Sequence, residues 1–149
     1  MNLAVAYAEN NNHFKAIECL KRAIAVNPND ANAYLNLGVI YAQEGNNEQA
    51  VEHLNKAIQL NPGAASAYVN LGVIAGGNKD YDQEITCYKK AIELEPNIEE
   101  IYVNLAIAYL AKNDKISALK QVFRLRELKR NDWAARLEDF IHTGRQANP

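Results

Sequence analysis

Histidine, cysteine and serine are among the side chains of this sequence that could act in catalysis or bind a metal. His13, His53 and His142 stand far apart, and no cysteine or acidic cluster lies near them at the spacing of metal ligands. The serines Ser66 and Ser117 form no Ser/His/Asp set with them. We therefore expect no catalysis, no metal site and no cofactor.

Two further features could bind an anion. Gly76-Gly77 is not followed by the Lys-Ser/Thr that a phosphate-binding loop needs. A basic stretch near the C-terminus is diluted by Glu127, and cations are favoured in the last turns of a helix. The stretch consists of Lys120, Arg124, Arg126, Lys129 and Arg130. We interpret it as a solvated helix face, with a patch for an anionic partner as the alternative.

Composition narrows the class of protein. The formal net charge is −2, which argues against a nucleic-acid-binding protein. The apolar stretch 101–110 is interrupted by Asn104 and is too short to cross a bilayer. No secretory signal is visible, because the apolar run 3–8 has no basic residues before it. These features predict a cytoplasmic protein without membrane insertion.

A repeat of 34 residues organises the chain. Residues 31–40, ANAYLNLGVI, match residues 65–74, ASAYVNLGVI, and Tyr102–Ile107 continue the series one period later. Cys19 and Cys87 are 68 residues apart, which is two periods. Helices are about 10 Å in diameter, so these two thiols lie too far apart for a disulfide and are interpreted as structural.

Each unit has the pattern of a helical hairpin. Apolar residues recur at helical spacing in its first half, and Asn46 with Gln49 is typical of a capping box that opens a second helix. Asp80 and Gln83 repeat that arrangement, and Pro62 ends the second helix. One hairpin cannot bury both of its apolar faces, so neighbouring units must stack.

The order of residue types resembles the tetratricopeptide repeat (TPR) family over about residues 1–132. The residues that carry the resemblance are Tyr34, Leu37, Gly38, Tyr41, Ala50, Leu54, Ala57 and Pro62. The resemblance implies an all-α, right-handed superhelical solenoid of antiparallel helix pairs, whose first helices line a concave groove. It implies a clipped first unit at 1–30 and full units at 31–64, 65–98 and 99–132. The expected helices are 2–10, 13–26, 31–44, 48–60, 65–76, 81–94, 99–112 and 115–130.

The two ends differ. Met1 falls one residue after the aromatic that opens the motif, so we expect a fragment of a longer array with an open, self-associating N-terminal face. At the other end, Asp132 is expected to cap a helix over 133–144, with Trp133, Leu137, Phe140 and Ile141 on one side. We interpret it as a capping helix, with a docking helix for a partner as the alternative, and 145–149 as a tail.

Asparagines recur at the full period before the core leucine. They are Asn2, Asn36, Asn70 and Asn104. Their place in the pattern predicts that they face the concave groove, where a carboxamide can pair with both the C=O and the N–H of an extended peptide. The ladder looks like the one in the TPR superhelix of O-linked N-acetylglucosamine transferases, and armadillo-type solenoids use asparagines similarly. The alternative is that these residues only order water or cap neighbours.

Aliphatic residues accompany the ladder. They are Leu35, Val39, Val69, Val73, Val103 and Ile107, with Val5 in the first unit. TPR modules that clamp an acidic C-terminus place Lys and Arg on this surface, and this chain has none there. The sequence therefore predicts an apolar, Asn-lined groove for a hydrophobic or amphipathic segment.

The third unit departs from the pattern. Ala75 replaces a tyrosine, and Glu84 stands where a small alanine packs. A buried, unpaired carboxylate is costly, so we expect Glu84 to reach solvent or to find a donor. The small residues around Gly76 are further expected to open a pocket beside Asn70.

Three functional hypotheses follow. The first is a non-catalytic protein–protein interaction module that binds a peptide in its groove. The second is a self-assembling scaffold, a homo-oligomer formed through the open N-terminal face. The third is the substrate-recognition arm of a larger enzyme.

Overall fold

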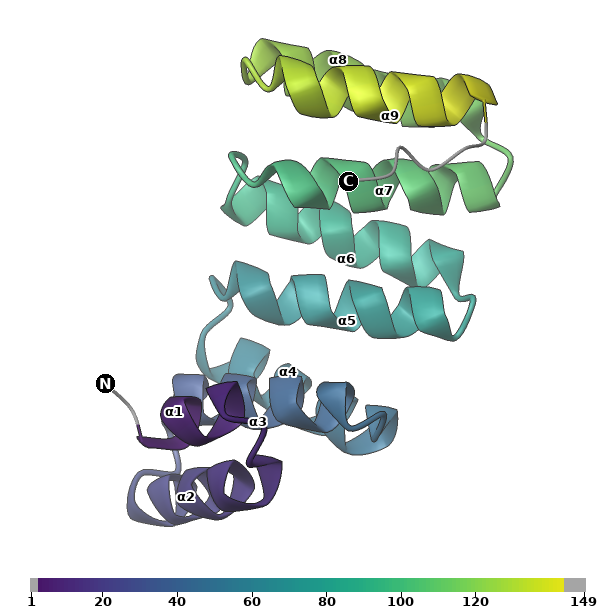
Figure 1. The fold of residues 1–149 in the computed structure, drawn as a ribbon. Helices are drawn as coiled ribbons and strands as arrows, with labels where there is room; N and C mark the ends of the chain where they lie inside the picture. Colours follow the sequence, from purple (N-terminus) through teal and green to yellow (C-terminus); the bar gives the residue numbers. More distant parts are fainter. Residues whose placement is uncertain (1–2, 144–149) are drawn as a thin grey trace. The chain divides into compact units, whose positions relative to one another are not determined.

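The computed structural model of the protein describes residues 3–143, in which all regular structure is α-helical (Figure 1). The chain divides into two compact units, Met1–Ile74 (unit 1) and Ala75–Pro149 (unit 2). Unit 1 holds α1 (Leu3–Glu9), α2 (His13–Val26), α3 (Ala31–Gln43), α4 (Asn47–Leu60) and most of α5 (Ala65–Gly77). Unit 2 holds the end of α5, then α6 (Tyr81–Leu94), α7 (Glu99–Ala111), α8 (Lys115–Glu127) and α9 (Asn131–Thr143).

The turns within the helix pairs share one design. Each contains one residue in the left-handed region, at Asn11, Gly45, Lys79 and Asn113, with φ of 55°, 76°, 62° and 59°. The next N–H donates to the carbonyl five residues back, for example Asn46 N to Tyr41 O at 2.9 Å and Asp114 N to Tyr109 O at 2.9 Å. This arrangement ends a helix and satisfies its last carbonyls. The left-handed residues are themselves 34 positions apart, so the turn is part of the repeat.

The residue after each turn caps the second helix, with one exception. The side chains of Asn12, Asp80 and Asp114 accept backbone N–H groups of Lys15, Gln83 and Ser117 at 3.3, 3.1 and 2.9 Å. The capping box predicted at Asn46 is wrong: its side-chain amide donates to Oε1 of Gln49 at 2.6 Å and accepts no backbone N–H. A carboxamide can donate as well as accept, so the sequence pattern alone did not decide its direction.

The core of unit 1 is built from one leucine of each of three helices, Leu20, Leu37 and Leu54, all fully buried. Helices α3 and α4 pack closely because Gly38 lies directly under Leu54. A Cβ placed on Gly38 would lie 2.7 Å from Cγ of Leu54, closer than real contacts allow. The small residue thus permits the large one to be buried.

The last two helices of unit 2 have boundaries that differ from the expected ones. Helix α8 ends at Glu127 because Lys129 takes a left-handed φ of 59° and Arg130 N donates to Leu125 O at 2.8 Å. Helix α9 therefore begins at Asn131, and Asp132 lies in its first turn rather than at the predicted cap. Leu137 and Ile141 of α9 are buried in the core of unit 2, and Trp133 and Phe140 pack against it.

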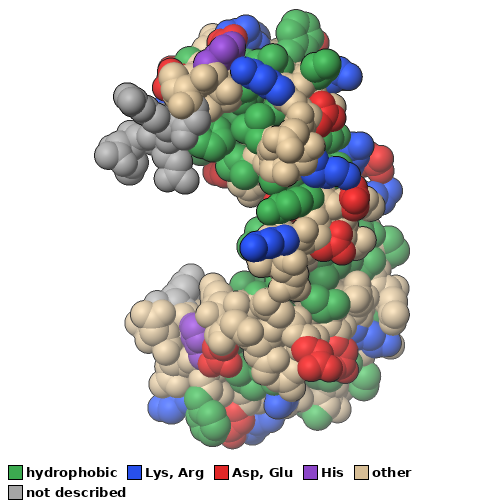
Figure 2. All heavy atoms as spheres, turned by 90° about the vertical axis from the view of Figure 1, so that its right-hand side faces the viewer, with side chains coloured by type: hydrophobic (Ala, Val, Ile, Leu, Met, Phe, Trp, Pro, Cys, Tyr) green, Lys and Arg blue, Asp and Glu red, His purple; other side chains and the backbone are tan. Residues whose placement is uncertain are grey.

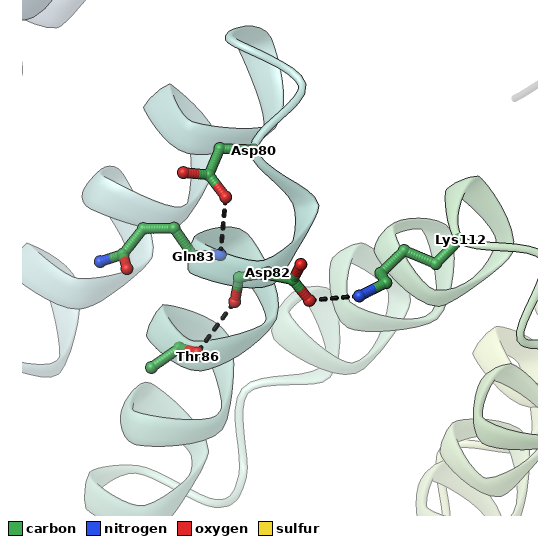
Figure 3. A network of polar contacts seen from close by, with 5 residues as sticks. All are labelled: Asp80, Asp82, Gln83, Thr86 and Lys112. Carbon is green, nitrogen blue, oxygen red and sulfur yellow. Dashed lines mark hydrogen bonds and ion pairs between the residues drawn. The ribbon is translucent and has the colours of Figure 1, made fainter.

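An ion pair joins α6 to the end of α7 in unit 2. Figure 3 shows the Asp82 carboxylate beside the ammonium of Lys112, next to the capping residue Asp80. The carbonyl of Asp82 also accepts the Thr86 hydroxyl at 2.8 Å. The Asp82 side chain is 83% exposed and that of Lys112 39% exposed, so water screens the pair and it contributes little to stability.

None of the helices in residues 3–143 combines the length and apolar character needed to span a membrane.

Candidate functional site

The ladder asparagines lie on the first helices of their units. Asn36 lies on α3, Asn70 on α5 and Asn104 on α7, and each side chain is half-buried. Asn2 lies outside the described residues. In each unit, these asparagines and their aliphatic neighbours form a surface that we call the ladder face of that unit. Its described members are Leu35, Asn36, Val39, Val69, Asn70, Val73, Val103, Asn104 and Ile107.

In unit 1 the ladder face opens onto a cleft of about 220 Å³, the ladder cleft. Asn36 and Val39 of α3 line it together with Val5 of α1, and none of the described residues that line it is charged. Its members are Ala4, Val5, Ala8, Leu20, Asn36, Val39, Ile40 and Gln43. The lining can therefore accept an apolar side chain and offers two carboxamides, those of Asn36 and Gln43, to a peptide backbone.

On α5 the ladder residues combine an engaged amide with an exposed aliphatic side chain. Nδ2 of Asn70 donates to the carbonyl of Ser66 at 2.8 Å, a bond within its own helix. That bond fixes the direction of the carboxamide and uses one of its N–H groups. Val73 is 54% exposed, whereas valine is one of the residue types most often found fully buried.

On α7 in unit 2 the aliphatic residue beside the asparagine is again exposed. Ile107 is 44% exposed, and Asn104 is half-buried. Val103, in contrast, packs against the core of unit 2, as Leu35 packs against the core of unit 1. These two residues therefore serve the core as well as the ladder face.

Two larger clefts lie against the second helices, and the sequence analysis missed both. The one in unit 1, the lysine cleft, has a volume of about 660 Å³ and is lined by residues of α2, α3 and α4. The one in unit 2 has a volume of about 630 Å³ and is lined by residues of α6, α7 and α8 and the α6–α7 turn. A signal for both clefts was present in the sequence. Four residue types recur at twice the repeat period, Lys21, Ile24, Tyr34 and Leu37 in the first cleft and Lys89, Ile92, Tyr102 and Leu105 in the second.

His53 forms one wall of the lysine cleft. Its ring stacks on Tyr41 with centroids 5.5 Å apart and is tilted against Tyr34 at 6.0 Å. Burial lowers the pKa of His53. Two smaller effects oppose each other, because Glu52 raises this pKa and Lys21 lowers it. The imidazole is therefore neutral at neutral pH and acts as a packed aromatic ring.

Glu84 finds a donor, which was one of the two outcomes expected for it. It is only 8% exposed, and the Tyr88 hydroxyl, one helical turn on, hydrogen-bonds to its carboxylate. A Cβ placed on Gly76 would lie 2.7 Å from the Glu84 carboxyl carbon, so the carboxylate fills the space beside the glycine. The space beside Gly76 is therefore occupied, and the pocket expected beside Asn70 stays a prediction. Burial raises the pKa of Glu84 and also that of Tyr88.

Three of the five residues in the basic stretch at and after α8 form ion pairs. Arg124 pairs with Glu127 at 2.7 Å, Arg126 with Glu138 at 2.5 Å, and Arg130 approaches Glu99 at 3.6 Å. Figure 2 likewise shows positive and negative side chains interspersed with apolar ones on the face that it draws. This agrees with a solvated helix face.

Within residues 3–143 no group of three or more His, Cys, Asp or Glu side chains is placed to hold a metal ion. Cys19 and Cys87 are free thiols, and Cys87 is buried. Burial raises the pKa of the Cys87 thiol, which opposes formation of the reactive thiolate.

Comparisons with known proteins agree with this architecture. Family models of the tetratricopeptide repeat match residues 1–65, 65–98 and 87–120. Among solved structures, a crystal structure of MamA is 28% identical with a TM-score of 0.80, over 87% of this protein and 76% of that one. A crystal structure of MamA protein is 26% identical with a TM-score of 0.79, over 99% and 76%. No curated protein sequence matches. The predicted fold class, an all-α TPR solenoid, is confirmed, and the chain belongs to the tetratricopeptide repeat family.

Proposed function

We propose that this protein is a non-catalytic protein–protein interaction module that binds an extended or amphipathic peptide segment on its ladder face. The observation that carries the proposal is the ladder cleft. There Asn36 and Val39 stand together with Val5, and no described residue of the lining is charged. The exposed Val73 and Ile107, at the positions of Val39 in later repeats, extend the same chemistry.

The chemistry suits a polypeptide ligand. Carboxamides at regular intervals can pair with backbone carbonyl and N–H groups, which every peptide offers. Aliphatic side chains beside them provide apolar area for alternate side chains of the ligand. The described residues of the ladder cleft include no Lys or Arg, which disfavours a ligand held by a terminal carboxylate.

The test replaces Asn36, Asn70 and Asn104 together by alanine and measures affinity for peptides selected by display on the wild-type protein. Each lost hydrogen bond contributes about 1 kcal/mol, so affinity should fall at least roughly tenfold. The melting temperature should change little, because none of the three residues belongs to the buried core.

A matched control replaces Asn29, Asn78 and Asn97, which are exposed and lie outside the helices. This variant also carries three Asn→Ala substitutions, but away from the ladder face, and should bind the peptides as tightly as the wild type does. Equal affinity of the ladder variant and this control would overturn the peptide-binding proposal.

Self-association is the second candidate function. It is favoured by apolar side chains on the first two helices that reach solvent, with Phe14 79% exposed and Leu3 60% exposed. Light scattering over a range of concentrations should then show mass rising with concentration, and Phe14→Ser should reduce that rise. A monomer at every concentration would rule this candidate out.

A further inference from the structure

The lysine cleft and the cleft of unit 2 are built from equivalent positions two repeats apart. Each has a lysine and an isoleucine from one second helix, a tyrosine and a leucine from a first helix, and a cation from the next second helix. The corresponding pairs are Lys21 and Lys89, Ile24 and Ile92, Tyr34 and Tyr102, Leu37 and Leu105, Lys56 and Arg124. The shared framework shows that the cleft is a product of the repeat rather than a local irregularity.

The lysine cleft is separate from the ladder face. None of its lining residues belongs to that face. On α3, Tyr34 lies roughly 160° around the helix from Asn36, because successive residues are about 100° apart. A ligand in the lysine cleft therefore uses a surface that the proposed function leaves free.

The charge balance of the two clefts differs. The lysine cleft is lined by Lys21 and Lys56 and one acid, Glu52, and the neutral His53 adds no charge. No ion pair within residues 3–143 involves Lys21 or Lys56, and both side chains are exposed. The lysine cleft thus holds an excess of positive charge.

In the cleft of unit 2 the cations are already engaged. Arg124 forms its ion pair with Glu127 at 2.7 Å, and the Lys89 ammonium lies 5.8 Å from the centroid of the Tyr109 ring. Glu93 also lines the cleft, and its carboxylate pairs with Lys90, outside the lining, at 2.8 Å. The position of Glu127 is held by Gln59 in the lysine cleft, which leaves Lys56 without that partner.

We propose that the lysine cleft binds an acidic segment of a protein partner, whose carboxylates pair with Lys21 and Lys56. Ile24, Tyr34 and Leu37 line the same cleft and receive an apolar side chain next to the acidic residues. A cation beside an apolar surface selects a carboxylate that is accompanied by an aliphatic or aromatic residue. The cleft of unit 2 has the same framework but satisfied charges, and does not bind such a segment.

The experiment selects peptides from a random displayed library on the 149-residue protein and titrates each against four proteins. These are the wild type, Lys21→Glu/Lys56→Glu, the matched variant Lys89→Glu/Arg124→Glu, and the triple alanine variant of the ladder. Acidic peptides with an apolar residue should be enriched. The affinity of these peptides should fall roughly tenfold or more for Lys21→Glu/Lys56→Glu, because two charge-assisted contacts become repulsive, and should stay unchanged for the other two variants.

Circular dichroism of each variant verifies folding, which exposed substitutions should leave intact. The proposal is overturned if no acidic peptide is enriched, or if the acidic peptides bind Lys21→Glu/Lys56→Glu as tightly as the wild type. It is also overturned if the acidic peptides lose as much affinity for Lys89→Glu/Arg124→Glu, or for the ladder variant, as for Lys21→Glu/Lys56→Glu. Failure of the ladder variant to weaken any peptide would count against the proposed function alone.

Discussion

Helices α3 and α4 of unit 1 and the corner of unit 2 around Gly76 solve the same packing problem in two ways. In unit 1 the position of Ala50 is completely buried and apolar, and Gly38 makes room for Leu54. One period later Glu84 stands at the position of Ala50, and Gly76, at the position of Ala42, makes room for its carboxylate. The repeat thus tolerates a buried acid when a glycine removes the steric conflict and a tyrosine supplies a donor.

The comparison also shows what each solution requires. The apolar version is stabilised by burial of Leu54 and needs no hydrogen bond. The polar version depends on the Tyr88 hydroxyl and on the absence of a Cβ at residue 76, because the carboxylate is shielded from water. We therefore expect the two regions to respond differently to substitution.

The largest effect should come from Leu54→Ala in unit 1. Removing a fully buried leucine leaves a cavity, and such changes reduce the free energy of unfolding by about 2–5 kcal/mol. Chemical denaturation measures the change. Ile58→Ala on the same helix is the control and should cost less, because Ile58 is only half-buried. Equal losses would show that the contact between Leu54 and Gly38 is not tightly packed.

The next effect is a coupling between residues 76 and 84. In the Glu84→Ala background, Gly76→Ala should stabilise the protein by about 1 kcal/mol, the helix preference of alanine over glycine. With Glu84 present the new methyl group meets the carboxylate, so this gain should be lost or reversed. A double-mutant cycle measured by denaturation should give a coupling of at least about 1 kcal/mol.

Gly77→Ala is the control for that cycle. A Cβ at residue 77 has no neighbour within 4 Å, so its effect should be the same with either residue at position 84. A coupling as large for Gly77 as for Gly76 would mean that the Glu84 carboxylate does not occupy the space described.

The third effect is a dependence of stability on pH. Because burial raises the pKa of Glu84 in the folded state, the folded protein favours the protonated form. The stabilisation that protonated Glu84 provides is complete below the usual glutamate pKa of 4.5, and it is lost as the pH rises through the raised pKa of the folded state. Glu84→Gln removes this titration. The stability of wild type minus that of Glu84→Gln should therefore fall as pH increases, and a difference that rises with pH would contradict the burial of Glu84.

The smallest effect should come from Asp82→Asn, which breaks the ion pair with Lys112 shown in Figure 3. Exposed pairs contribute about 0.2–1 kcal/mol, and salt screens them. The difference from the wild type in thermal unfolding should shrink further in high salt. A loss as large as that of Leu54→Ala would show that the start of α6 depends on this contact far more than its exposure suggests.

Much of the fold was predictable because local rules and the repeat agree. Helix α2 runs from His13 to Val26 and α6 from Tyr81 to Leu94, both as expected from apolar spacing and from the closing Asn-Pro and Glu-Pro. The end of α8 was missed because Lys129 adopts a left-handed turn that lysine does not favour by itself. The direction of the Asn46 amide was missed because a carboxamide has both donors and an acceptor.

The sites show the same division. Equal spacing predicted that Asn36, Asn70 and Asn104 occupy equivalent positions, since identical places in a repeat have similar surroundings. The spacing could not predict that Asn70 would bond to Ser66, or that the Glu84 carboxylate would fill the space at Gly76. Those outcomes depend on side-chain rotation and on free space between helices.

By itself the sequence determined that this protein is a series of helical hairpins. The period of its apolar residues, turns and prolines acts through the backbone, and the helix pairs follow it. Only the tertiary structure decided which side chains meet across helices. It joined Lys21 and Lys56 with Tyr34 in one cleft and buried Glu84 against Gly76, because residues distant along the sequence come together only when helices pack. The repeat sets the positions, and packing determines their chemistry.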